Sequence, residues 1–279
     1  MRNAYVLAFV LLLWLRPYGG GQSLIADTKG PLDRWFQIVA HTQTEQPHWI
    51  APVFTPTARL EQMFVYDVSR QNTAKGDVTN LGGTKGLLLI PNEHINFVLT
   101  PPAYFAHENA KIHDGFGDMS FLLKYRLAAA NEEQGNYVVT GFVSTTIATG
   151  AYKNGAPHAM INPSVGFGKG WGHFDVQSTL GVGVPVGDAG KLGTPFSYNT
   201  AFQYVVLKKI WPEVEINGTV FPNGPNAGKT QIFLSPGLMF GKLHLWRRLG
   251  FAMGGGVQIA ATHFHTFNHN RVLTLRFPF

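Results

Sequence analysis

HFDVQSTLGVGV, residues 173–184, alternates apolar residues with polar residues or glycine along most of its length. Phe174, Val176, Leu180, Val182 and Val184 would share one face of an extended chain, whereas Asp175, Gln177 and Thr179 would share the other. A period of two residues is typical of a half-buried β-strand. The segment is also as long as the roughly 9–11 residues with which a tilted strand crosses a bilayer.

The same alternation recurs along the chain from Arg59 to the C-terminus. It predicts about twelve strands, bounded by turn and loop residues. We expect them at 59–68, 83–90, 94–104, 116–127, 136–147, 159–169, 173–184, 197–208, 213–221, 231–240, 247–259 and 270–279.

The predicted connections alternate in length. Short ones such as 91–93, 170–172 and 209–212 follow long ones such as 69–82 and 185–196, and only 128–135 is intermediate. Bacterial outer-membrane barrels combine short periplasmic turns with longer outer loops. The sequence therefore predicts an all-β fold, a closed antiparallel transmembrane β-barrel over residues 59–279.

The composition agrees with this fold class. Only 14% of the residues are charged, against roughly a quarter in soluble domains, while 45% are hydrophobic. The absence of cysteine excludes a disulfide scaffold, a thiolate metal site and a cysteine nucleophile. The net charge is +6, but no dense run of Lys and Arg indicates a nucleic-acid partner.

The first residues resemble a secretory signal peptide, which we place at 1–21. Arg2 precedes the apolar run 4–15, and Gly19 and Gly21 would suit cleavage before Gln22. The run is too short to span a bilayer as a helix. The alternative is a buried N-terminal helix. Export followed by barrel formation predicts the bacterial outer membrane as the location, with its lipid as a partner.

Aromatic residues are expected at two special positions. Trp171, Trp211 and Trp246 fall in short connections and would lie at one membrane interface, where an apolar ring with a polar N–H is favoured. The last strand ends with Phe277 and Phe279, which resembles the signal read by the bacterial barrel-assembly machinery. An ordinary half-buried strand is the alternative for that ending.

Charged and amide residues share the polar face of the predicted strands, and we expect them to line the lumen. Both signs are present, so these side chains can pair across the barrel. A narrow pore for small-molecule solutes is predicted, since twelve strands lie between filled barrels of about eight and water-filled ones of about 16–18. A sealed structural or sensory barrel is the alternative. The residues are Arg59, Glu61, Asp67, Lys124, Arg126, Asp175, Gln177, Asn199, Gln203, Glu215, Asn217, Gln258 and Arg276.

Residues 22–58 lack clear alternation and contain several aromatic residues and prolines, among them Trp35, Trp49 and Pro52. They would form either a plug inside the lumen or a flexible periplasmic leader.

Other chemistry is weakly indicated. Residues 224–230 are one residue short of a phosphate-binding loop and lie between two strands, so no nucleotide or other cofactor is expected. His263, His265 and His269 are weak candidates for a metal site, because no carboxylate in their loop would orient them. A membrane-embedded lipid-modifying enzyme is the remaining alternative, but no Gly-x-Ser-x-Gly motif supports it.

Two stretches resemble the outer-membrane proteins of the meta-pathway phenol-degradation family. GFGDMSFLLKYRL at 115–127 is similar to a motif of that family, and PHWIAPVFTPTARLEQMFVYD at 47–67 looks like the entry to the first strand in some members. The resemblance implies a channel-like protein that passes small hydrophobic or aromatic compounds. It implies no catalytic residues.

Overall fold

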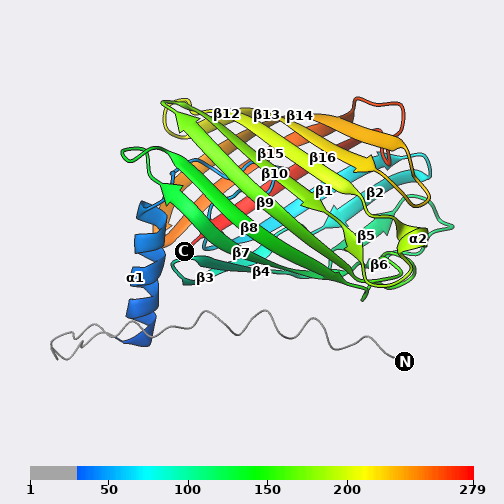
Figure 1. Ribbon diagram of the computed structural model, residues 1–279, viewed down its shortest axis with the longest axis horizontal. Coiled ribbons are helices and arrows are strands. Elements are labelled where there is room, and N and C mark those ends of the chain that lie inside the picture. The colour runs from blue at the N-terminus through cyan, green and yellow to red at the C-terminus, as the bar shows by residue number, and fades with distance from the viewer. Residues whose placement is uncertain (1–29) are drawn as a thin grey trace.

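The computed structural model describes residues 30–279, which form a β-barrel with a helix at each end (Figure 1). The predicted signal peptide 1–21 lies outside the described residues. No helix in the described part of the chain is long and apolar enough to cross a membrane. The helices are α1 (Pro31–Thr44) and α2 (Ala189–Leu192), and the strands are β1 (Met63–Thr73), β2 (Gly76–Leu81), β3 (Gly86–Asn92), β4 (Ile95–Thr100), β5 (Tyr104–His107), β6 (Gly115–Phe116), β7 (Met119–Ala130), β8 (Tyr137–Ile147), β9 (Met160–Trp171), β10 (Phe174–Val182), β11 (Val184–Pro185), β12 (Phe196–Tyr204), β13 (Ile210–Phe221), β14 (Lys229–Trp246), β15 (Leu249–Ala260) and β16 (His269–Pro278).

The sheet closes on itself through its first and last strands. β16 pairs with β1 over the register Met63↔Pro278 to Asn72↔His269. Every other pairing is also antiparallel. Several barrel strands are interrupted: β2 and β3 both pair with β1, β4 pairs with β3, and β5 pairs with β2. Joining β2 with β3, β4 with β5, β6 with β7 and β10 with β11 gives a barrel of twelve strands. The predicted fold class is confirmed.

The two ends of the barrel differ, as the connection lengths predict. Short connections such as 93–94, 172–173 and 247–248 lie at the end that carries α1 and the C-terminus, and α2 lies at the other end (Figure 1). The expected long loop at 69–82 is instead a hairpin, because β1 continues to Thr73 and pairs with β2.

The alternation of the strands places apolar side chains outside and polar side chains inside. In β1, for example, Phe64 and Tyr66 are exposed on the outer surface, whereas Asp67 and Ser69 are buried. Closure pairs the backbone without leaving a sheet edge, which is the condition for strands in lipid. The outer surface is therefore suited to a bilayer.

The core lies inside the barrel, around residues 45–62, which we call the interior segment. Ile50 and Val53 pack against Trp211, Met239 and Ala252 of the wall. Further clusters join Trp49 and Ala58 to β8, and Leu60 to α1 and β3. The segment thus fills space that would otherwise be lumen.

Inner-face glycines make room for this segment. A Cβ added to Gly168 would lie 2.5 Å from Cζ3 of Trp49, and one added to Gly170 would lie 2.6 Å from its Nε1. Glycine weakens a strand unless another group approaches closely. At Gly168 the approaching group is the Trp49 ring, and at Gly170 it is the Asn136 side chain together with that ring.

Candidate functional site: the lumen and its interior segment

Wall carboxylates bind backbone N–H groups of the interior segment. Glu215 accepts hydrogen bonds from the amides of Phe54 at 2.8 Å and Thr55 at 2.5 Å. Glu213 accepts one from the amide of Val53 at 2.9 Å. The segment has no strand partner, so its buried peptide groups need such side-chain partners.

Wall cations bind carbonyl groups of the same segment. Lys124 of β7 donates to the carbonyls of Thr57 at 2.9 Å and Arg59 at 3.1 Å. Arg276 of β16 donates to the carbonyl of Pro52 at 2.7 Å and also to that of Ala51. Hydrogen bonds with an ionised partner are roughly twice as strong as neutral ones. The inner-face charges therefore hold the segment from opposite sides.

Buried amides extend this network. Gln177 donates to the carbonyl of Ile50 at 3.0 Å and accepts a hydrogen bond from the Thr57 hydroxyl at 2.7 Å. Gln177 also donates to Gln203 at 2.8 Å, and Gln203 donates to Glu213 at 2.5 Å. The wall side chains thus act as one connected group around the segment.

The expected pairing of opposite charges across the lumen is largely absent from the described residues. Among the predicted lumen residues, Arg59 pairs with Glu61 at 3.4 Å and Arg126 pairs with Glu45 at 3.6 Å. Both pairs include at least one residue of the interior segment. Lys124, Glu215 and Arg276 bind backbone groups instead, because the segment brings unpaired peptide groups within their reach. Asp67 and Asp175 accept hydrogen bonds from neighbouring side chains, those of Thr84 and Gln177.

All the predicted lumen residues face the interior. Asn199 and Gln258 line its large cavity, and the others are buried. Arg59 and Glu61 belong to the interior segment, since β1 begins only at Met63. Residues that the sequence reasoning missed include Lys85, Asn80, Glu213 and Asn270. Glu213 is the first residue of the predicted strand 213–221 and has the same parity as Glu215, so the alternation alone would have identified it.

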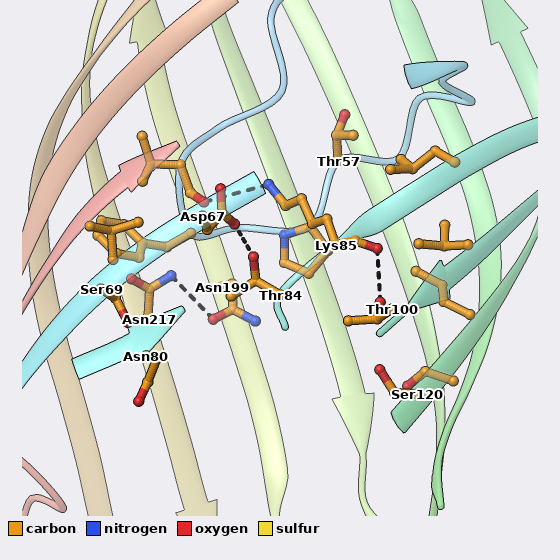
Figure 2. A pocket seen from close by; sticks show the side chains of 18 of the residues that line it. Thr57, Asp67, Ser69, Asn80, Thr84, Lys85, Thr100, Ser120, Asn199 and Asn217 are labelled. Carbon is orange, nitrogen blue, oxygen red and sulfur yellow. Dashed lines mark hydrogen bonds between the residues drawn. The ribbon is translucent and has the colours of Figure 1, made fainter. Parts of the chain in front are cut away.

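A cavity of about 450 Å³ lies within the barrel, bounded by the interior segment and the wall (Figure 2). Small-molecule sites typically have volumes of about 300–1,000 Å³. Figure 2 shows Asp67, Thr84 and Lys85 close together, with Thr100 and Ser120 on another part of the wall. The lining combines charged side chains, among them Asp67 and Lys85, with neutral polar ones and with apolar ones such as Leu122.

Two smaller cavities are lined by other parts of the interior segment. One of about 100 Å³ includes Ala51 and Arg59, and one of about 230 Å³ includes His48 and Trp49. Glu61 lines both the large cavity and the smallest one. The segment therefore lies where a solute crossing the lumen would have to pass.

The predicted interface tryptophans lie in different environments. Trp171 and Trp246 are 57% and 66% exposed, at strand ends beside short turns. The prediction for Trp211 is wrong, because this residue is 4% exposed and packs in the core. β13 begins at Ile210, so Trp211 has the inward parity of Glu213 and Glu215.

The histidine-rich loop holds no recognisable metal site. His265 bonds the carbonyl of Thr262 at 2.9 Å and the Asn268 side chain at 3.0 Å, and His269 begins β16. Within residues 30–279, no group of three or more His, Asp or Glu side chains is arranged to hold a metal ion. Residues 224–230 form a turn and the start of β14, without the helix that a phosphate loop requires.

The stretch 115–127 has a structural role in its first residues. Asp118 accepts hydrogen bonds from the amides of Thr149 at 3.0 Å, Gly150 at 2.8 Å and Ala156 at 2.7 Å. A Cβ at Gly117 would lie 2.3 Å from the ring of Phe105. This motif therefore fixes the loop between β8 and β9.

Comparison with known proteins shows similarity in fold. Sequence comparison finds no matching family and no similar curated protein. The structure is similar to that of the COG4313 outer membrane channel from Pseudomonas putida F1, with 15% identity and a TM-score of 0.53 over 82% of this chain and 98% of that one. It is also similar to the NanC porin, with 9% identity and a TM-score of 0.51 over 77% of this chain and 98% of that one. The expected likeness to outer-membrane channels is thus confirmed in fold.

Proposed function

We propose that this chain is an outer-membrane channel through which small molecules diffuse passively. The observation that carries the proposal is a cavity of about 450 Å³ inside a closed barrel with an apolar outer surface. The fold shared with an outer membrane channel and with a porin supports it. Apolar lining residues such as Phe121 and Leu122 are compatible with hydrophobic or aromatic solutes.

In this proposal, residues 1–21 direct export and are removed, and the barrel-assembly machinery recognises the C-terminal strand. Phe277 packs against Phe251 with their ring centroids 5.6 Å apart, and the amide of Phe279 donates to the carbonyl of Gln62 at 3.3 Å. The end with α1 and the short turns faces the periplasm, as in other outer-membrane barrels. The interior segment acts as the plug, and solutes pass beside it or when it moves.

The interior segment also favours a second candidate, a sealed barrel. Its backbone is bound by Glu215, Lys124 and Arg276, which extend from well-separated strands. If these contacts never open and leave no continuous path, the barrel has a structural or sensory role.

Conductance in planar bilayers distinguishes these functions. The full-length chain and a chain lacking residues 22–58 would each be folded in detergent, with heat-modifiable gel migration and β circular dichroism as folding controls. A channel predicts ion conductance by the full-length chain and a larger conductance after the deletion. Conductance by the shortened chain alone would support the sealed barrel, and no conductance by either folded chain would contradict the proposal.

A further inference from the structure

The short connections at the end of the barrel that carries α1 are basic on one side (Figure 1). The connection between β12 and β13 contains Lys208 and Lys209, and the neighbouring one between β14 and β15 consists of Arg247 and Arg248. Neither connection contains an acidic residue. All four side chains are exposed, and none forms an ion pair with a carboxylate of residues 30–279. We call these four cations the basic arc.

Another part of the same rim is acidic. The connection between β3 and β4 contains Glu93, and the connection between β7 and β8 contains Glu132 and Glu133. Neither of these connections contains Lys or Arg. The charges are therefore separated around the rim, and the basic arc attracts negative charge from outside the protein.

Large apolar side chains lie next to the cations of the basic arc. Leu207 is 82% exposed and directly precedes the two lysines. Trp246 precedes Arg247, whose guanidinium carbon is 4.7 Å from the centroid of the Trp246 ring. Trp171 ends β9, and Nζ of Lys169 is 6.0 Å from the centroid of its ring. Exposed tryptophan and leucine beside cations suit the boundary between acyl chains and headgroups, where the ring or chain is in lipid and the charge is in water.

The apolar surface beside the arc is continuous with the outer wall of the barrel. The Trp171 ring stacks on Phe174 with centroids 6.3 Å apart, and Phe174 stacks on Phe202 with centroids 6.5 Å apart. Tyr204, at the end of β12, is also exposed. A molecule that contacts both surfaces needs a negative group at the rim and an apolar body along the wall.

We propose that the basic arc binds anionic phospholipids, with the phosphate oxygens accepting hydrogen bonds from the cations and the acyl chains lying on the aromatic wall. Arginine presents paired donors that match a phosphate, and lysine supplies a compact positive charge. A headgroup with net negative charge is favoured over a zwitterionic one, because a zwitterionic lipid brings its own ammonium group to a surface that lacks negative charge. The inference requires only that the barrel lies in a bilayer, so it does not depend on whether the lumen conducts.

Fluorescence quenching by brominated lipids tests this inference, because Trp171 and Trp246 lie beside the arc. The full chain would be reconstituted in bilayers of phosphatidylglycerol and phosphatidylcholine in which either lipid carries bromine near its headgroup. The quenching that is lost in Trp171→Phe/Trp246→Phe protein reports the lipid at the arc, and its dependence on composition gives a relative binding constant. We expect phosphatidylglycerol to be preferred about fivefold or more, the effect of one cation near an anionic surface.

Neutral substitutions in the arc should abolish this preference. The variant leaves Arg248 in place, because its guanidinium carbon is 4.2 Å from the centroid of the Phe36 ring of α1. The matched control removes the same charge from exposed positions in the loops at the other end of the barrel, and it should change the relative binding constant less than twofold, since screened charges act locally. Lys208→Arg/Lys209→Arg keeps the charge of the arc and should keep the preference. The arc variant is Lys208→Gln/Lys209→Gln/Arg247→Gln, and the control is Lys75→Gln/Lys111→Gln/Lys153→Gln.

Heat-modifiable gel migration would verify that every variant is folded. Preference for phosphatidylglycerol in the parent, its loss in the arc variant and its retention in the control would support the inference. Equal affinity of the parent for the two lipids, an unchanged preference in the folded arc variant, or an equal loss in the control would overturn it.

Discussion

Replacing Glu215 with glutamine should release the interior segment from the wall. Glu215 is 0% exposed and accepts hydrogen bonds from the amides of Phe54 and Thr55. A glutamine keeps one acceptor, so one charge-assisted bond is lost and the other becomes neutral. With about 1.5–3 kcal/mol for a bond to a charged group and about 1 for a neutral one, we expect a loss of about 2–5 kcal/mol.

This free energy corresponds to a roughly 30- to 4,000-fold larger population of the released segment, because about 1.4 kcal/mol equals a factor of ten. The chain contains no cysteine, so a single reporter can be introduced without background. Ala51→Cys places a thiol on the interior segment at a site that is 2% exposed. Its alkylation rate by a water-soluble maleimide then follows the population of the open state when reclosing is fast.

Glu133→Gln removes the same charge from an exposed turn and is the control. The alkylation rate should rise by the stated factor in Glu215→Gln and stay within twofold of the parent in the control. An unchanged rate in folded Glu215→Gln protein would refute the reasoning that wall carboxylates hold the segment.

Three further predictions concern the ends and the strands of the barrel. Asp118→Ala should make the loop between β8 and β9 more sensitive to limited proteolysis, because three backbone amides lose their acceptor. Gly218→Val should lower stability to urea by about 1–3 kcal/mol, since its Cβ would lie 2.1 Å from a tyrosine ring, whereas Gly141→Val, with no atom within 4 Å, should be tolerated. Burial raises the pKa of Glu132, but hydrogen bonds from His48 outweigh burial, and the pKa lies below its usual value. A carboxyl group with a depressed pKa stabilises the fold at pH values above its unfolded pKa of about 4.3, and this stabilisation is lost as the pH falls through the pKa of the folded state. Tm should therefore fall more on acidification in the parent than in Glu132→Gln.

The alternation of residues was sufficient to predict the barrel. The backbone groups of each strand form hydrogen bonds with the neighbouring strands, so the side chains are free to follow the two environments. The apolar outer face and the polar inner face are therefore visible as alternation in segments such as 173–184. Trp211 was assigned to a turn because the predicted strand began at residue 213, whereas β13 begins at Ile210. In so short a connection, a shift of a few residues in the strand start decides whether a residue belongs to the turn or to the strand. The end of the β1–β2 hairpin, residues 69–80, was missed because its residues are mostly polar and show no apolar alternation.

The contacts of the interior segment could not be predicted from the sequence. Its residues show no period, because its position depends on side chains from β7, β13 and β16 that are far away in the chain. The parity of Lys124 and Glu215 indicated that they face inward. Whether they bind each other, water or a peptide group depends on what occupies the lumen, which only the three-dimensional structure describes.

Swelling of liposomes that contain the full-length chain tests the central claim most directly. Folded protein would be reconstituted and the vesicles diluted into isotonic solutions of neutral sugars of increasing size. The account predicts swelling faster than in protein-free vesicles for the smallest sugars, decreasing as the sugar approaches the size of the cavity. Swelling no faster than in protein-free vesicles, with the protein verified as folded, would contradict a channel.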